Sequence, residues 1–132
     1  MSEDLGALKE KTRKTGKMLF HTVDDAANAY TLWREFDKDL AKEFSMFFTG
    51  KLYSREVLSQ KQRELCAVAA LTVLNREHEL SLHIHAARNV GATREEIAEV
   101  IFQMAVYGGA PVMVEGLRVA KRVLQERREW KG

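Results

Sequence analysis

Residues 64–91, ELCAVAALTVLNREHELSLHIHAARNVG, decide the fold. A helix over residues 64–74 would be apolar on most sides, so we expect other helices to surround it. A break near Asn75 leads into a second helix, which should stop at Gly91 because glycine readily adopts the left-handed conformation that follows helix ends. The central helix and the helix after it are therefore predicted to form an antiparallel hairpin.

Helical signals continue on the C-terminal side of this hairpin. The run TREE, residues 93–96, fits a capping box that begins a helix through Tyr107. Gly108 and Gly109 are expected to end that helix. Pro111, the single proline of the chain, suits the first turn of a last helix.

Helices are also predicted on the N-terminal side of the hairpin, so the expected fold class is all-α. Residues 3–19 have a weakly amphipathic pattern. From Ala26 to near Gly50, apolar residues recur every three or four positions, which predicts one long helix with a stripe that faces the core. The stripe consists of Ala29, Trp33, Phe36, Leu40, Phe44 and Phe47.

Length and charge limit the function classes. The 132 residues suit a single domain, residues 1–132. The 21 basic and 19 acidic side chains are interspersed and give a net charge of +2, so no nucleic-acid partner is expected. The start of the chain is charged and the longest apolar run is too short to span a bilayer, so we expect a cytoplasmic protein that does not enter a membrane.

The chain has one cysteine, Cys66, which cannot form a disulfide within the chain. It lies in the apolar run of the central helix. A small buried hydrophobic residue is the expected role, and a reactive thiol is the alternative.

His78, His83 and His85 lie close together and suggest a metal site. The run HELSLH, residues 78–83, differs from the zinc motif HExxH by one residue in spacing. Histidines four residues apart share a helix face, whereas histidines five apart lie roughly 140° apart around the helix. Metal binding is therefore disfavoured, and His78 and His85 are interpreted as solvated or interface side chains.

Two acids are placed to meet His83. Glu79 precedes it by about one helical turn. Glu64 and His83 lie on opposite sides of the predicted break, each roughly 12 to 16 Å from it along its helix. A carboxylate that faces an imidazole in apolar surroundings can tune a proton donor or acceptor near neutral pH. The alternative, which spacing alone favours, is a surface ion pair between Glu64 and one of three cations, Lys61, Arg63 or Arg88.

From about Gly50 to its end, the chain resembles the carboxymuconolactone decarboxylase family of the AhpD-like superfamily. The resemblance rests on RxxL at residues 55–58, NR and ELxxHxxxA between residues 75 and 87, GxTxxEI at residues 91–97 and YGGAP at residues 107–111. It implies an AhpD-like helical bundle around the central helix and the hairpin, with residues 1–49 as a helical extension and residues 50–128 as the family core. It also implies a homo-oligomer, commonly a hexameric ring, with active sites near subunit contacts.

The superfamily that the chain resembles has two chemical branches. Redox members carry a glutamate, then a CxxC pair, then a histidine. Here Glu64 and His83 keep the spacing of the glutamate and the histidine, but Arg76 and Glu79 occupy the two cysteine positions. An alkyl hydroperoxidase or peroxiredoxin-like activity, including one that uses Cys66, is therefore disfavoured. The sequence is assigned to the decarboxylase branch, which lacks the cysteine pair.

The resemblance implies cofactor-independent decarboxylation of gamma-carboxymuconolactone or a related anionic lactone in aromatic-compound catabolism. His83 is assigned as the acid/base and Glu64 as the residue that orients it. Arg55 is expected to hold a substrate carboxylate, and the amides around Gly108 and Gly109 to bind an anion at the start of the last helix. The alternatives are a structural ion pair for Arg55 and a plain helix break for the glycines. No metal and no cofactor are expected.

One segment departs from the family pattern. After the proline the chain has VMVEGL, residues 112–117, in which Val114 replaces an amide side chain. Glu115 in the same segment adds a carboxylate that would repel an anionic substrate. A related lactone or a β-keto acid therefore stays open as the substrate, and so does a non-catalytic, ligand-binding oligomer of the same fold.

Overall fold

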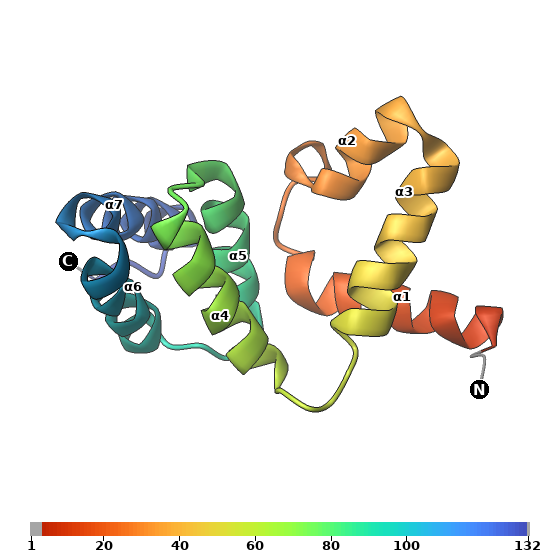
Figure 1. Cartoon of the computed structure of the whole chain (residues 1–132), viewed down its shortest axis with the longest axis horizontal. Helices are drawn as coiled ribbons and strands as arrows, with labels where there is room; N and C mark the ends of the chain where they lie inside the picture. The colour runs from red at the N-terminus through yellow and green to blue at the C-terminus, as the bar shows by residue number, and fades with distance from the viewer. Residues whose placement is uncertain (1–3, 132) are drawn as a thin grey trace. The chain divides into compact units, whose positions relative to one another are not determined.

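The computed structural model describes residues 4–131, and all regular structure in that range is helical (Figure 1). The prediction of an all-α fold is confirmed. The chain divides into two compact units, Met1–Ser59 and Gln60–Gly132. The boundary between the two units lies after Ser59, whereas the resemblance placed the end of the N-terminal extension at residue 49. That the chain is a single domain stays a prediction. None of the helices within residues 4–131 has the length and apolar character needed to cross a membrane.

The C-terminal unit contains four helices: α4 (Gln60–Val73), α5 (Glu77–Asn89), α6 (Arg94–Gly108) and α7 (Ala110–Glu126). Helix α4 packs against α5 and α6, and α7 packs against α6 and α5. All four helices, together with the turn before α6, contribute to one apolar core. Its buried members are Val68, Leu80, Ile84, Ala87, Ala92, Ile97, Ile101, Val119, Ala120 and Val123.

The hairpin of α4 and α5 has the predicted turn. Asn75 has a φ of 56°, a left-handed conformation that asparagine tolerates better than most residues. The Arg76 amide donates to the carbonyl of Leu71 at 3.0 Å and so closes the end of α4. This turn reverses the chain, so residues distant along the two helices come into contact.

The other predicted helix boundaries in this unit are also confirmed. Gly91 has a φ of 96° between α5 and α6. Thr93 and Glu96 form both hydrogen bonds of a capping box at the start of α6. Gly109, with a φ of 93°, separates α6 from α7, and a proline lies in the first turn of α7.

Helix α4 is covered on most sides, as predicted: it packs against α5, α6 and α7, and its exposed residues within Gln60–Val73 form one stripe of Gln62, Cys66 and Ala70. Its buried residues are Glu64, Val68 and Thr72, which are spaced by four and form a single stripe. Cys66 is exposed, which corrects the expectation that it is buried. Cys66 therefore lies on the one exposed side of α4.

In the N-terminal unit, α1 (Leu5–Phe20) confirms the first predicted helix, of which residue 3 lies outside the described residues. The predicted long helix from Ala26 to Gly50 is wrong. It is divided into a short 3₁₀ turn (Asp25–Ala27), α2 (Ala29–Phe36), α3 (Lys38–Ser45) and a π-helical segment, η2 (Met46–Leu52).

Asp37 is the reason for the main break. Its backbone is extended, with φ −158° and ψ 109°, and its carboxylate accepts a hydrogen bond from the Leu40 amide at 2.9 Å. Aspartate is a strong N-cap because its side chain satisfies an amide that has no partner in the first helical turn. The residue therefore ends α2 and begins α3.

The break also changes where the predicted apolar stripe lies. Trp33 and Phe44 are partly buried, and their ring centroids lie 5.4 Å apart in an edge-to-face arrangement. Phe36, Leu40 and Phe47 are 85%, 42% and 55% exposed, so the expectation that they face the core is wrong.

Gly50 lies where η2 meets α1, and a methyl group there should destabilise the N-terminal unit. A Cβ at Gly50 would overlap the Thr12 hydroxyl, which donates to the Leu8 carbonyl, and would lie 3.0 Å from Leu8 Cδ1. Gly50→Ala is expected to lower the free energy of unfolding by about 1–3 kcal/mol in urea denaturation. Gly16→Ala is the matched control, because its Cβ would meet only Thr49 Cγ2, at 3.8 Å. In mid-helix that change should stabilise by up to about 1 kcal/mol. Equal effects at both positions would contradict the packing argument.

Candidate active site

Glu64 and His83 meet across the α4–α5 hairpin. His83 Nδ1 lies 2.6 Å from Glu64 Oε1. The Glu64 side chain is 0% exposed and the His83 side chain is 20% exposed. The prediction that Glu64 forms a surface ion pair, which spacing alone favoured, is wrong because Glu64 is buried. Two of the candidate cations have other partners: Lys61 pairs with Glu96 at 2.8 Å and Arg88 pairs with Glu129 at 3.0 Å.

Helical spacing explains why one member of this pair is buried and the other is not. Glu64 is the first residue of the buried stripe of α4, one turn before Val68. On α5, His83 lies beside Ile84, which is fully buried in the core. The carboxylate therefore lies inside the helix packing, while the imidazole lies at its edge and can reach a bound molecule.

The hydrogen bond assigns different roles to the two imidazole nitrogens. A carboxylate oxygen is chiefly an acceptor, so the geometry assigns Nδ1–H of His83 as the donor to Oε1, and Nε2 is the ring nitrogen that does not contact Glu64. The second carboxylate oxygen, Glu64 Oε2, is buried and has no hydrogen-bond partner among the described residues. Burying a carboxylate oxygen without a hydrogen-bond partner costs free energy. The hydrogen bond between His83 and the other oxygen, Oε1, is therefore important for stabilising the buried Glu64 carboxylate. Glu64, rather than Glu79 on α5 itself, orients Nδ1.

The other two histidines have different surroundings. His78 is exposed in the first turn of α5, and its carbonyl accepts a hydrogen bond from the Ser81 hydroxyl at 2.6 Å. His85 lies against the end of α7, where Arg127 Nη1 is 3.2 Å from its Nδ1 and Glu126 is 3.6 Å from its Nε2. Within residues 4–131, no three side chains of histidine, cysteine, aspartate or glutamate are grouped so that they could hold a metal ion.

The surroundings of His85 predict a pH-dependent stability. Burial, and next the charge of Arg127, lower the pKa of His85 below its ordinary value of 6.5. The unfolded chain then binds a proton more readily than the folded chain, so the free energy of unfolding should fall as the pH drops below 6.5. Urea denaturation at a series of pH values would measure this slope, and His85→Gln should reduce it. An unchanged slope in that variant would assign the effect to other groups.

Glu129 contributes in a lower pH range. Burial alone would raise the pKa of Glu129, but hydrogen bonds from Arg88 and Arg127 outweigh it and hold the pKa below 4.5. Its contribution to stability should therefore be lost only as the pH falls below 4.5. The contributions of His85 and Glu129 can therefore be distinguished, because the free energy of unfolding should change below pH 6.5 for His85 and below pH 4.5 for Glu129.

The predicted substrate-binding residues belong to different parts of the structure. Arg55 is exposed and belongs to the N-terminal unit, whereas Gly108 belongs to the same unit as the pair. A Cβ at Gly108 would lie 3.6 Å from the Cα of Val73, at the far end of α4 from Glu64. With a rise of 1.5 Å per residue, Val73 and Glu64 are about 14 Å apart along the helix axis. Roles for Arg55, Gly108 and Gly109 in binding substrate stay predictions.

Two side-chain contacts were missed from the sequence: one ion pair and one hydrogen bond. Glu115, expected to repel an anionic substrate, lies 3.2 Å from Arg118, and the spacing of three residues on a helix could have indicated this pair. Arg127, in the charged run at the C-terminus, contacts His85 across 42 residues of sequence. No local spacing could have indicated that second contact.

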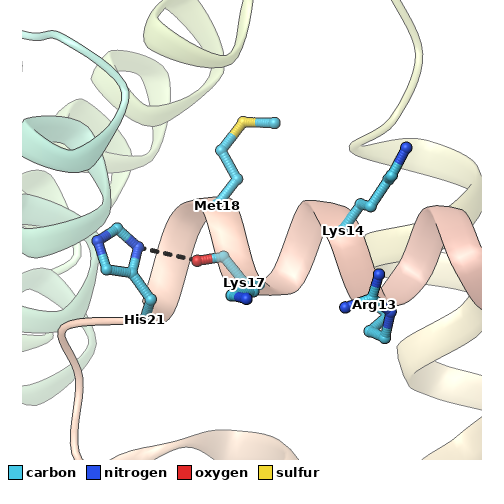
Figure 2. A pocket seen from close by; sticks show the side chains of 5 residues that line it. All are labelled: Arg13, Lys14, Lys17, Met18 and His21. Atoms are coloured by element: carbon cyan, nitrogen blue, oxygen red, sulfur yellow. Dashed lines mark hydrogen bonds between the residues drawn. The ribbon is translucent and has the colours of Figure 1, made fainter.

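A separate hollow lies on the exposed face of α1 (Figure 2). His21 faces back toward the same helix, with its Nδ1 2.9 Å from the Lys17 carbonyl oxygen. The lining side chains are exposed; four of the five come from α1 and His21 directly follows it, so nothing buried orients a ligand there. We therefore place the candidate active site at Glu64 and His83. The hollow is lined by Arg13, Lys14, Lys17, Met18 and His21.

Comparison with known proteins gives a family match that spans this site, together with individual relatives. Residues 38–122 match the carboxymuconolactone decarboxylase family, a range that includes Glu64 and His83. The chain is 33% identical over 92 residues to 4-carboxymuconolactone decarboxylase from Acinetobacter baylyi, covering 70% of this chain and 69% of that protein. It is 32% identical over 104 residues to nitrosuccinic acid decarboxylase from Metarhizium robertsii, covering 79% and 71%. An uncharacterized 15.0 kDa protein from Paracoccus denitrificans is 41% identical over 91 residues, covering 67% of each chain.

Proposed function

We propose that this chain, which belongs to the carboxymuconolactone decarboxylase family, acts as a decarboxylase without a cofactor. It removes carbon dioxide from gamma-carboxymuconolactone or a related small anionic substrate. The observation that carries this proposal is the contact of 2.6 Å between the buried Glu64 carboxylate and the partly exposed His83 imidazole. Such a pair suits proton delivery to carbon, which completes a decarboxylation.

The chemistry of the substrate explains why a cofactor is unnecessary. In gamma-carboxymuconolactone the carboxylate leaves from the γ-carbon of an unsaturated lactone. The bond from that carbon to the carboxyl carbon breaks, and its electron pair moves through the ring double bond to the lactone carbonyl oxygen. The substrate is thus its own electron acceptor. The protein must orient it, stabilise the developing oxyanion and supply one proton to carbon.

His83 and Glu64 take the proton-transfer part of this reaction. A protonated His83 donates from Nε2 to the ring carbon that receives the proton, while Glu64 accepts the hydrogen bond from Nδ1–H. The carboxylate holds the ring in one orientation and stabilises its positive charge before transfer. Solvent then returns the proton to the imidazole for the next turnover.

The relatives support a decarboxylase more strongly than they support one substrate. Two of them are named as decarboxylases, one for 4-carboxymuconolactone and one for nitrosuccinic acid. A nitro group, like an unsaturated lactone, can accept an electron pair from the carbon that loses carbon dioxide. The proposed substrate class is therefore a small carboxylate that carries an electron-accepting group.

A redox reaction has less support from the structure. Cys66 is the single cysteine of the chain. It lies two residues after Glu64 on α4, about 200° around the helix axis, and therefore faces away from the pair. A peroxidase that uses His83 would need a thiol beside the imidazole.

Product analysis of the purified chain would test the proposal. Gamma-carboxymuconolactone and nitrosuccinate would be supplied separately and carbon dioxide release followed, with a hydroperoxide and a thiol reductant in a parallel assay. We expect turnover of at least one carboxylate and an unchanged rate in Cys66→Ser. Peroxide turnover that disappears in Cys66→Ser would reverse the assignment. Absence of any turnover by a folded protein would favour the non-catalytic, ligand-binding alternative.

A further inference from the structure

The segment that follows α7, residues 127–131, turns back onto the rest of the C-terminal unit. The Arg128 amide donates to the Gln125 carbonyl at 3.0 Å, and the Glu129 amide donates to the Leu124 carbonyl at 2.7 Å. Arg128 has a φ of 59°, a left-handed conformation that costs free energy for a residue with a Cβ. Contacts elsewhere in the segment must therefore hold this backbone in place.

Glu129 joins the segment to α5. Its carboxylate accepts hydrogen bonds from Arg88 of α5 at 3.0 Å and from Arg127 at 2.7 Å. Arg88 also donates to the carbonyl of Ala92, in the turn before α6, at 2.9 Å. One carboxylate and two guanidinium groups thus connect the segment with the end of α5.

Trp130 and Lys131 join the segment to α6 and α7. Arg94, the first residue of α6, donates to the Lys131 carbonyl at 2.8 Å, and its guanidinium carbon lies 4.2 Å from the centroid of the Trp130 ring. Lys121 Nζ of α7 lies 5.3 Å from the same centroid. Because the segment is attached to three helices, residues 127–131 are here called the C-terminal latch.

One contact of the C-terminal latch requires an uncharged partner. Arg127 Nη1 lies 3.2 Å from His85 Nδ1 on α5. A guanidinium has only donors, so Nδ1 must accept this hydrogen bond. A proton on Nδ1 would remove the acceptor and would place two positive charges next to each other. Protonation of His85 and its contact with Arg127 therefore exclude each other.

The charges around His85 act in both directions. Burial, and next Arg127, lower the pKa of His85 below 6.5, against the opposite effect of Glu126 and Glu129. Glu126 Oε2 lies 3.6 Å from His85 Nε2, so it would attract the imidazolium while Arg127 is repelled. Charged side chains of α4, α5 and α6 that form ion pairs near α5 do so with other groups, namely Glu64 with His83, Lys61 with Glu96 and Arg88 with Glu129.

We propose that the C-terminal latch is a pH-sensitive switch, closed while the His85 imidazole accepts a hydrogen bond from Arg127 and open when that imidazole is protonated. Loss of the contact separates Arg127 from α5 and removes part of the support for the left-handed backbone at Arg128. Trp130 then moves away from Arg94. The proposal does not depend on the reaction that the chain catalyses.

Fluorine NMR of the full chain labelled with fluorotryptophan would test the proposal. The chain has two tryptophans, so Trp33→Phe identifies the Trp130 signal. Between about pH 8 and about pH 5, the range in which histidine titrates, that signal should move toward the shift of an unfolded chain. The midpoint should lie below 6.5. Helical circular dichroism should stay constant over the same range, because only the segment after α7 opens.

His85→Gln and Arg127→Met separate the two sides of the contact. The glutamine amide can still accept from Arg127 but does not titrate, so the Trp130 signal should keep its closed position throughout. Methionine cannot donate to His85, so Arg127→Met should show the open position throughout. His78→Gln is the matched control, because His78 is exposed in the first turn of α5, and it should respond to pH like the wild type.

The proposal would be overturned by a wild-type Trp130 signal that does not change with pH, or by a change that persists in His85→Gln. An Arg127→Met protein that closes and opens like the wild type would also contradict it. A loss of helical circular dichroism at the same midpoint would mean that the whole unit unfolds, and would overturn the switch as well.

Discussion

His83→Gln is expected to lower the turnover number by about 100-fold or more while leaving the fold intact. Glutamine keeps a polar side chain of similar reach next to Glu64, but it cannot carry and release a proton near neutral pH. Loss of a general acid typically costs 10²- to 10⁴-fold in rate. Steady-state kinetics on the best substrate, with circular dichroism as a check on folding, would measure the effect.

His78→Gln and His85→Gln are the matched controls for this prediction. His78 is exposed and His85 contacts Arg127, so neither faces Glu64. Their rates per folded molecule should stay near that of the wild type. An active His83→Gln protein, or activity that returns only with added zinc, would remove His83 from the proposed reaction.

Glu64→Gln is the second variant with a large expected effect, on the order of 100-fold in turnover. The amide is nearly the same size as the carboxylate, so packing in the stripe with Val68 and Thr72 should change little. What is lost is the negative charge that fixes Nδ1–H of His83 and stabilises the imidazolium. In serine proteases, the equivalent change of an orienting carboxylate to its amide has a still larger effect.

Two further measurements test whether Glu64 orients His83 or has a purely structural role. Glu64→Gln should lower the turnover number more than it changes KM, and the pH dependence of the turnover number should shift because the charge beside the imidazole is gone. Glu79→Gln, on the same helix as His83, should leave both quantities unchanged. A Glu64→Gln protein with wild-type kinetics would show that the buried carboxylate serves packing alone.

Much of the C-terminal unit could be predicted because its signals are local. The capping box of Thr93 and Glu96 and the proline of α7 each fix a boundary through contacts within a few residues. Local signals did not determine the Glu64–His83 contact. Its two residues are 19 apart in the sequence, and the contact depends on the turn at Asn75 and on how α4 and α5 are rotated about their axes. Spacing made this contact geometrically feasible, and the family resemblance selected it over a surface ion pair.

The N-terminal unit was predicted less well because a period of three to four residues does not reveal an interruption. Asp37 sits within the apolar pattern, and its capping hydrogen bond to the Leu40 amide competes with continuing the helix. The same limitation applies to Cys66. Its apolar neighbours predicted burial, but the side of a helix that neighbours cover depends on tertiary packing, which hydropathy alone does not specify.

The position of Glu64 on α4 links the proposed proton transfer to the alignment of two helices. Consecutive residues on a helix are about 100° apart, so a shift of the α4–α5 pairing by one residue would turn the carboxylate away from the imidazole. Such a misaligned protein could keep its helical content, since Ala67, Ala69 and Ala70 offer alternative small contact residues along α4. During refolding, turnover should therefore recover later than helical circular dichroism, and enzyme assays would report the native alignment of the hairpin where spectroscopy of the backbone cannot.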